Sequence, residues 1–250
     1  MALIHLNFFS HTLGMCTSAD VIIPQRSDPI DTPDNYPTYK VLFLLHGLSD
    51  DHTIWQRRTS IERYADEKGI AVVMPNCHRS WYTDMAHGGK YYTFISKELT
   101  AVCMNMFRGM STKREDHYIA GLSMGGYGAL KFGLSMPDFF SHIASFSGAV
   151  NVYERVALSP GTYSDVFGII DTSKDSVNDL FYLAEKASKL ENRPSVYMWC
   201  GTEDFLIEEN RKFTAHLSSL GYEHTYCESS GNHSWPYWDE QIKKVLNLWF

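Results

Sequence analysis

The chain has 250 residues, of which 44% are hydrophobic and 20% charged, and its formal net charge is −7. These values are ordinary for a globular protein of one α/β domain or two smaller ones, and the negative charge disfavours nucleic acid or an anionic membrane surface as the main partner. No apolar stretch approaches the roughly 18 residues of a membrane span, and the N-terminal residues lack the basic start of a secretory signal. The five cysteines form no Cys-x-x-Cys pair, so we expect reduced thiols in a cytoplasmic protein.

The first half of the chain alternates between short apolar runs and segments of helical periodicity. A proline-rich stretch at residues 25–38 is expected to be a surface loop. Short apolar runs predict buried strands at residues 40–46, 70–75 and 117–120. Helices are expected at residues 60–69 and 94–108. Thr59 and Glu62 resemble a capping box for the first of these helices, and Gly69 is placed to end it.

The second half continues this alternation. Strands are expected at residues 142–147, 195–200 and 222–227, and two helices follow the last two of these strands. Residues 151–189 break the rhythm, so we expect loops and a short helix over one end of the sheet, as a cap-like insertion or a subunit contact. The pattern predicts a single α/β domain over residues 1–250, with a mostly parallel sheet covered by helices on both faces.

One glycine-rich segment, IAGLSMGGYG at residues 119–128, follows a predicted strand directly. Gly121-x-Ser123-x-Gly125 matches the nucleophile elbow, a tight strand-to-helix turn that lifts a serine clear of the sheet. Glycines at 121 and 125 would prevent backbone collisions across that turn, and glycines at 126 and 128 would let the helix approach the sheet. A packing turn without chemistry is the alternative. The position between a strand and a helix favours Ser123 as a nucleophile.

A serine nucleophile requires a histidine that is oriented by a carboxylate. The strand at 195–200 runs into Gly201-Thr202-Glu203-Asp204, and we prefer Asp204 over Glu203 as the acid, although Asp204 could instead cap the next helix. Of the eleven histidines, His233 alone follows the last predicted strand on a loop. The order Ser123, Asp204, His233 is the order that the elbow motif requires.

The tetrahedral intermediate of acyl transfer needs backbone donors for its oxyanion. The amide of Met124, directly after the nucleophile, is one candidate. The amide of Leu48, after the glycine of His46-Gly47-Leu48, is the other. His46 is expected to fix this loop rather than to act as a base. No spacing of His, Cys, Asp and Glu suggests a metal site, and no cofactor is expected.

These motifs together resemble the esterase D-like branch of the α/β-hydrolases, and most closely the bacterial tributyrin esterases. The resemblance runs from about residue 40 to the C-terminus and rests on these segments: Leu44-Leu45-His46-Gly47-Leu48-Ser49, Trp55, Trp81-Tyr82-Thr83-Asp84, Gly121 to Gly126, Gly201 to Asp204, and Gly231-Asn232-His233-Ser234-Trp235. It implies the α/β-hydrolase fold with an eight-stranded sheet. It also implies a cofactor-free carboxylesterase for short acyl chains, with the triad Ser123, His233 and Asp204 and an oxyanion hole at Leu48 and Met124.

Other functions remain open. S-formylglutathione hydrolases share the scaffold, but they typically carry Ser-Pro-Arg-Gly where this chain reads Asn-Cys-His-Arg-Ser-Trp at 76–81. Feruloyl or acetyl esterases of soluble carbohydrate esters, an acyltransferase and a non-enzymatic binding protein are further alternatives. Trp55 and Trp81 are candidate substrate-binding residues that would narrow the acyl pocket. The expected partner is a small-molecule ester, and homo-oligomerisation is left open.

Overall fold

The computed structural model describes residues 1–25, 38–169 and 176–250. Within these ranges the chain builds one eight-stranded sheet in the order β1-β2-β4-β3-β5-β6-β7-β8. The strands are β1 (Ala2–Ser10), β2 (Met15–Ile23), β3 (Val41–Leu45), β4 (Ala71–Pro75), β5 (His117–Leu122), β6 (His142–Phe146), β7 (Ser195–Gly201) and β8 (His224–Ser229). Strands β4 to β8 pair in parallel around β3, which confirms the predicted α/β fold.

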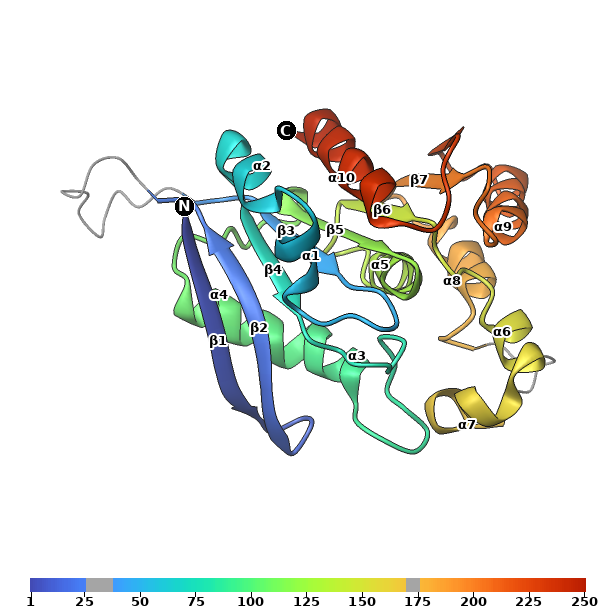
Figure 1. Cartoon of the computed structure of the whole chain (residues 1–250), viewed down its shortest axis with the longest axis horizontal. Helices are drawn as coiled ribbons and strands as arrows, with labels where there is room; N and C mark the ends of the chain where they lie inside the picture. The colour runs from blue at the N-terminus through green and yellow to red at the C-terminus, as the bar shows by residue number, and fades with distance from the viewer. Residues whose placement is uncertain (26–37, 170–175) are drawn as a thin grey trace.

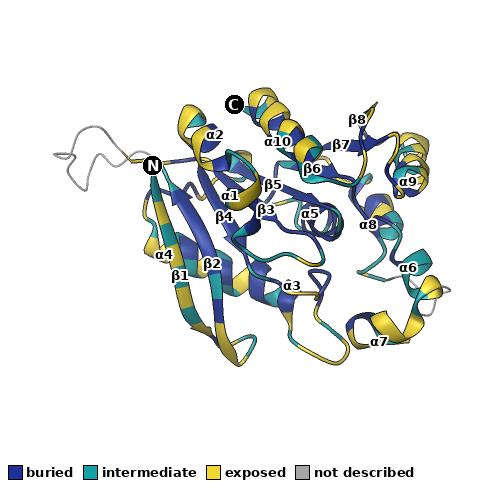
Figure 2. Cartoon of the chain, in the orientation of Figure 1, coloured by how far each residue is buried: buried dark blue, intermediate teal, exposed yellow. Residues whose placement is uncertain are grey.

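An N-terminal hairpin was not foreseen. Strands β1 and β2 pair antiparallel with each other, and β2 pairs antiparallel with β4 (Figure 1). Residues along β1 alternate between half-buried and exposed, because only one face of this edge strand lies on the core (Figure 2). The hairpin therefore supplies the antiparallel part of the sheet.

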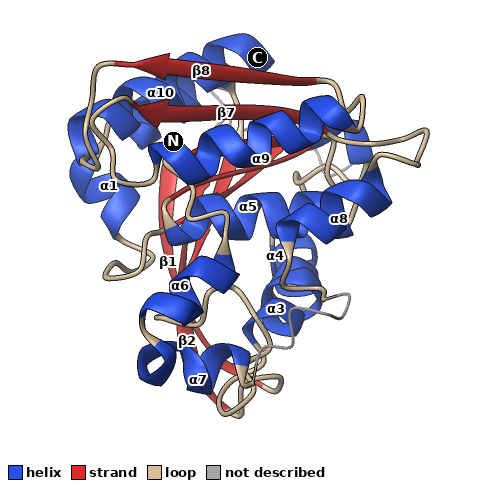
Figure 3. Ribbon diagram, turned by 90° about the vertical axis from the view of Figure 1, so that its right-hand side faces the viewer, coloured by secondary structure: helices blue, strands red, loops and turns tan. Residues whose placement is uncertain are grey.

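Helices cover both faces of the sheet. Helices α1 (Ile54–Arg58), α2 (Ile61–Lys68) and α10 (Trp235–Trp249) pack on one face. The other face carries a π-helical segment (Phe94–Leu99), α4 (Thr100–Met106), α5 (Met124–Ser135), α8 (Leu180–Ala187) and α9 (Ile207–Ser219), of which the last three are seen together in Figure 3. The short helix α3 (Tyr91–Thr93) lies on the same side, and the short turn η3 (Arg114–Asp116) directly precedes β5. This layering is what allows the central strands to be apolar on both faces.

Two local predictions need correction. The helix expected at 94–108 begins at Tyr91 and passes through the π-helical segment before it continues as α4. The capping box is not formed, because Ser60 occupies the N-cap of α2 and the Thr59 hydroxyl accepts instead from the Ile61 amide at 3.1 Å. Gly69 ends α2 in the left-handed conformation, with φ of 63°, as expected.

The last strand begins two residues later than expected. Gly221, with φ of 63°, ends α9, and the Tyr222 amide still bonds to the Leu217 carbonyl of that helix at 2.9 Å. Tyr222 therefore belongs to the turn rather than to the strand, and β8 starts at His224.

The segment between β6 and β7 is more helical than expected. It contains α6 (Val152–Leu158), α7 (Pro160–Phe167) and α8, where loops and one short helix were expected. Helices α6 and α7 project beyond the sheet (Figures 1 and 3). The proline-rich stretch predicted as a surface loop lies, except at its two ends, outside the described residues. In the described ranges, no helix is long and apolar enough to cross a membrane.

Candidate active site

The turn between β5 and α5 holds Ser123 in an unusual backbone conformation. Its φ of 53° and ψ of −117° lie in a region that non-glycine residues rarely adopt. Three hydrogen bonds fix the turn: the Ser123 amide donates to the Phe146 carbonyl at 2.9 Å, and its carbonyl accepts from the Tyr127 and Ala149 amides. These bonds hold the strained serine at the end of the sheet, as a nucleophile elbow requires.

Glycines make this turn possible. A Cβ on Gly121 would lie 2.3 Å from the Gly125 carbonyl oxygen, and a Cβ on Gly125 would lie 2.4 Å from the Leu45 carbonyl oxygen. Any side chain at either position would therefore collide with backbone that cannot move independently. A Cβ on Gly126 would likewise lie 2.7 Å from the Ser145 hydroxyl, so the glycine lets α5 pass close to β6. The glycines keep the helix against the sheet.

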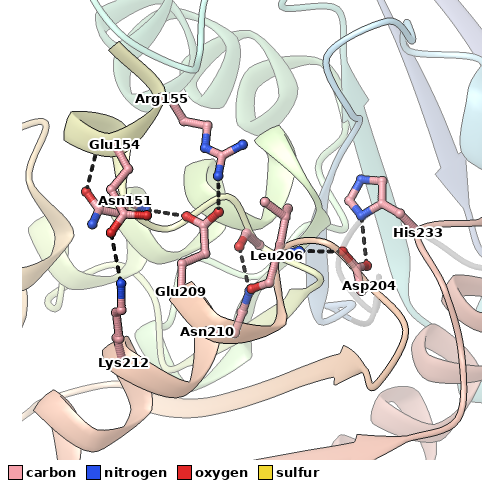
Figure 4. A network of polar contacts seen from close by, with 10 residues as sticks. Asn151, Glu154, Arg155, Asp204, Leu206, Glu209, Asn210, Lys212 and His233 are labelled. Carbon is pink, nitrogen blue, oxygen red and sulfur yellow. Dashed lines mark hydrogen bonds and ion pairs between the residues drawn. The ribbon is translucent and has the colours of Figure 1, made fainter. Parts of the chain in front are cut away.

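An aspartate and a histidine pair at the ends of β7 and β8. Asp204 is 2% exposed, and its Oδ2 lies 2.8 Å from Nδ1 of His233 (Figure 4). The Asp204 Oδ1 accepts from the Leu206 amide at 2.9 Å, just before α9 begins, so this carboxylate contacts both the backbone and the imidazole. Because Nδ1 faces a carboxylate, it carries a proton, which leaves Nε2 of the neutral ring as an acceptor. That is the arrangement a general base needs.

Hydrogen bonds keep Asp204 ionised. Burial alone would raise the pKa of its carboxyl group, but the bonds from His233, the Leu206 amide and the Ser147 hydroxyl together lower that pKa below its ordinary value. Ser147 follows Phe146, whose carbonyl holds Ser123. The acid and the nucleophile are therefore connected through neighbouring residues at the end of β6. Ser147 was not identified from the sequence as a residue that contacts the acid. Its position directly after the apolar residues of a predicted strand was the only feature that pointed to such a role.

Glu203, the alternative candidate for the acid, has a structural role instead. Its carboxylate accepts from the Gly231 amide at 2.5 Å, and its own amide donates to the Gly231 carbonyl at 3.0 Å. A Cβ on Gly201 would collide with the Gly231 backbone, which explains the glycine at 201. At Gly231, which has a φ of 158°, a Cβ would lie 2.9 Å from the Tyr237 ring. Glu203 therefore fastens the loop that carries His233 to the loop that carries Asp204.

Aromatic rings enclose His233 on two sides. The centroid of Phe205 lies 4.7 Å from the imidazole centroid, and Trp238 of α10 meets the imidazole edge-on at 4.8 Å. Trp238 is itself fixed by a hydrogen bond from its indole to the Ser147 hydroxyl at 3.2 Å. Phe205 is 70% exposed, so it forms an apolar rim beside the imidazole. These contacts restrict rotation of the ring.

His46 fixes the loop after β3, as expected. Its Nδ1 lies 2.7 Å from the Gly47 carbonyl, and its Nε2 accepts from the Cys77 amide at 3.0 Å. Burial lowers the pKa of His46 to about 4, so the ring is neutral at physiological pH and each nitrogen has a defined role. The Tyr82 hydroxyl also donates to the His46 carbonyl at 2.8 Å. The loop that carries Leu48 is thus rigidly held.

Leu48 and Met124 follow β3 and β5, two neighbouring parallel strands that end at the same edge of the sheet. Within the described part of the chain, neither amide donates to another protein group. Met124 is the first residue of α5, where helix N–H groups have no intrahelical partner. Both amides are therefore available as donors, as an oxyanion hole requires.

The two candidate tryptophans are both buried. Trp55 is 1% exposed, packs edge-on against Trp235 and donates from its indole to the Leu45 carbonyl at 3.0 Å. Trp81 is 3% exposed and packs against Tyr127 of α5 and Phe167 of α7. A substrate would reach Trp55 only by displacing core residues, whereas Trp81 lies where α7 meets the loop before α3. Substrate contact by either residue stays a prediction.

A surface cleft of about 590 Å³ begins at the Leu48 loop. Residues 48–50 form one side, residues 78–80 form another, and Met85 and Tyr91 complete it. The cleft thus leads from one candidate oxyanion donor to the surface, as a substrate site would. Among the described residues, no group of three His, Cys, Asp or Glu side chains could hold a metal ion.

A polar network joins the candidate site to α6 (Figure 4). Buried Asn210 of α9 donates to the Leu206 and Gly148 carbonyls, and its neighbour Glu209 accepts from the Asn151 amide at 2.9 Å. The Glu209 carboxylate also pairs with Arg155 at 2.8 Å. Helix α6 is therefore anchored to the same helix that follows Asp204.

Comparisons with known proteins show what the whole chain is similar to. A family model described as "Putative esterase" matches residues 10–247. An acetyl esterase of Caldicellulosiruptor saccharolyticus is 31% identical over 98% of this chain and 97% of its own length. A substrate-bound structure of fluorophosphonate-binding serine hydrolase F of Staphylococcus aureus has a TM-score of 0.92 and 36% identity, covering 99% of this chain and 98% of that one. A structure titled S-formylglutathione hydrolase from the same organism has a TM-score of 0.89 and 36% identity, with the same coverage of both chains.

Proposed function

Because this chain belongs to the putative esterase family of α/β-hydrolases, and is accordingly a carboxylic ester hydrolase, we propose that it hydrolyses short-chain acyl esters through Ser123, His233 and Asp204. The observation that carries the proposal is the 2.8 Å contact between His233 Nδ1 and a buried, ionised Asp204. It lies at the end of the sheet where the strained elbow presents Ser123. A packing turn would need neither the strain nor this pair.

The proposed mechanism has two acyl-transfer steps. Nε2 of His233 takes the proton of Ser123 as its Oγ attacks the ester carbonyl, and Asp204 stabilises the imidazolium that forms. The amides of Leu48 and Met124 donate to the oxyanion. His233 then returns the proton to the departing alcohol, and water repeats the sequence to release the acid.

The segment from α6 to α8 is proposed to act as a cap-like insertion in a single catalytic domain. Backbone bonds from the Ala86 and His87 amides to the Val166 and Asp165 carbonyls join α7 to the loop before α3. The Trp81 ring is enclosed by this contact. Preference for short acyl chains would follow if the acyl group enters beneath α7, because Trp81 and Phe167 leave little room there.

S-formylglutathione hydrolysis is the second candidate. It is favoured by the solved structure of that title, which is 36% identical over nearly the whole chain. The loop at residues 76–81 differs from the sequence expected of that group. A direct comparison of oxygen esters with the thioester separates the two.

The test measures turnover of p-nitrophenyl esters from acetate to octanoate, with S-formylglutathione in parallel. Ser123→Ala is expected to lower kcat by at least about 10⁴-fold while the fold is retained, because the remaining groups cannot form the acyl-enzyme. Ser218→Ala, on the exposed side of α9, is the matched control and should behave as wild type. Substantial activity in a folded Ser123→Ala variant would contradict the proposal. A dominant activity on S-formylglutathione would promote the second candidate.

A further inference from the structure

The carboxylate of Asp50 lies beside the proposed nucleophile. A Cβ placed on Gly47 would have three near neighbours within 4 Å: Leu122, the Asp50 Oδ2 at 3.0 Å and the Ser123 Cβ at 3.9 Å. The Asp50 carboxylate oxygen and the Ser123 Cβ therefore both lie close to the same point. A bond from the Gly47 amide holds the carboxylate in this place. Asp50 is half-buried, and the proposed triad does not use it.

Asp50 is also a wall of the 590 Å³ cleft that begins at Leu48. The other charged or titratable groups in the lining are His78, Arg79 and Tyr91, which come from a different segment. The cleft is therefore acidic on the side of the oxyanion loop and basic on another wall. Its hydroxyl and charged groups suit the polar alcohol part of an ester better than an apolar acyl chain.

Several charges act on Asp50 from neighbouring elements. Burial and the Asp51 carboxylate raise the pKa of Asp50, whereas the Gly47 amide and the guanidinium groups of Arg57 and Arg58 on α1 oppose this rise. The Asp51 carboxylate instead points toward Thr53 and accepts hydrogen bonds from its amide at 2.9 Å and from its hydroxyl at 2.6 Å. The two adjacent carboxylates thus differ in direction, and of the two only Asp50 lines the cleft.

We propose that Asp50 determines specificity for the leaving alcohol: its carboxylate favours alcohol groups that carry a hydroxyl or a positive charge near the ester oxygen, and disfavours groups that carry a carboxylate there. The inference rests on the proposed function and concerns the same site. The reason is Coulombic. A unit charge a few ångströms from a half-buried carboxylate interacts with it strongly enough to change relative rates by about tenfold.

The experiment compares esters that share an acetyl group and differ in the charge of the alcohol: acetylcholine, ethyl acetate and acetoxyacetate. The measured quantity is the ratio of kcat/KM for acetylcholine to kcat/KM for acetoxyacetate, at pH 8, in wild type and in the isosteric variant Asp50→Asn. When the ratio for Asp50→Asn is divided by the ratio for wild type, the intrinsic reactivity of each ester drops out. This division also cancels any effect of Asp50 on the shared oxyanion.

Asp50→Asn is expected to lower the ratio about tenfold, and the matched control Asp51→Asn should change it less than about threefold. Raising salt from 20 to 500 mM should also lower the wild-type ratio, which tests the charge without any substitution. An unchanged ratio in folded Asp50→Asn, or an equal change in Asp51→Asn, would overturn the inference. Ethyl acetate and p-nitrophenyl acetate report on the proposed function separately. If neither is hydrolysed in a Ser123-dependent way, that function fails, and this inference fails with it.

Discussion

The two halves of the candidate site are held in place by different physical means. The elbow depends on residues without a side chain, because glycines at 121 and 125 allow backbone segments to touch where a methyl group would not fit. The acid and histidine loops depend on polar bonds, with Glu203 fastening Gly231 and Asp204 fastening His233. The difference teaches that the nucleophile turn requires close backbone contacts in addition to its hydrogen bonds, whereas the base requires a charged partner. Each half should therefore fail in its own way.

The largest effect on turnover within this comparison is expected from Asp204→Asn. An amide would reverse the hydrogen bond to Nδ1 of His233 and favour the wrong tautomer, so kcat should fall about 10⁴-fold while the melting temperature changes little. Steady-state kinetics and thermal unfolding together measure this. A loss below about tenfold would show that another group orients the imidazole.

A smaller loss of turnover with a larger loss of stability is expected from Gly125→Ala. The new methyl group would lie 2.4 Å from the Leu45 carbonyl oxygen, so α5 must shift away from β3. We expect about 3 kcal/mol of lost stability, measured by denaturant unfolding, and a lower kcat because Ser123 moves with the helix. Gly161→Ala, where a Cβ would meet nothing within 4 Å, is the control. Equal behaviour of the two variants would argue against a packed elbow.

A moderate effect is expected from Glu203→Gln. The neutral amide keeps the shape but weakens the bond to the Gly231 amide, so the His233 loop should loosen and kcat should fall about tenfold. Exposed Glu240→Gln on α10 is the control. The Ser123 side should be unaffected, so a reactive phosphonate that labels the serine should still bind at saturation. A stability loss without a change in kcat would assign Glu203 a purely structural role.

The smallest effect on turnover is expected from a substitution of Lys131, a buried residue in the second half of α5. Its ammonium is buried and donates to the Thr83 hydroxyl and the Asn178 side-chain oxygen, both at 2.6 Å. Burial lowers the pKa of Lys131 to about 7, against an ordinary value of 10.5. Between these values the unfolded chain binds the extra proton, so this residue makes the free energy of unfolding rise with pH by up to about 1.4 kcal/mol per unit.

Lys131→Met should therefore remove that dependence between pH 7 and 9. Urea unfolding at several pH values measures it as the difference between wild type and variant, which cancels the other titrating groups. Exposed Lys212→Met on α9 is the control. A parallel pH dependence in wild type and Lys131→Met would mean that the lysine is charged throughout the range.

The sequence allowed the parallel part of the sheet to be predicted, and with it the positions of the loops that carry the candidate triad, because both depend on local patterns. The apolar runs of β3 and β4, and the glycines around Ser123, carry their meaning within a few residues. The order of Ser123, Asp204 and His233 then follows from the fold. His46 was also assigned correctly to a structural role, since a histidine followed by glycine at a strand end suits a loop contact.

The rest depended on contacts between distant residues. The β1–β2 hairpin has a period-two pattern, but its place at the edge is set by the pairing of β2 with β4. Helices α6 and α7 are stabilised by Glu209 and by the loop before α3, neither of which is near them in sequence. Trp55 looked available for a substrate because its burial depends on Trp235, which is 180 positions away. Asp50 was overlooked because nothing local distinguishes it from Asp51.

The complete burial of α5 from Met124 to Leu134 also affects which substitutions the protein can tolerate during evolution. The hydrogen-bonded amides in the later turns of this helix should exchange with solvent only when the whole domain opens, whereas those of the cleft loop at residues 78–80 should exchange through local fluctuations. If the cleft binds the leaving alcohol as proposed, substitutions in that loop should alter which alcohol is accepted without changing the turn that holds Ser123. The fold therefore separates helix α5, where substitutions would disturb the core, from the cleft loop at residues 78–80, where substitutions are tolerated.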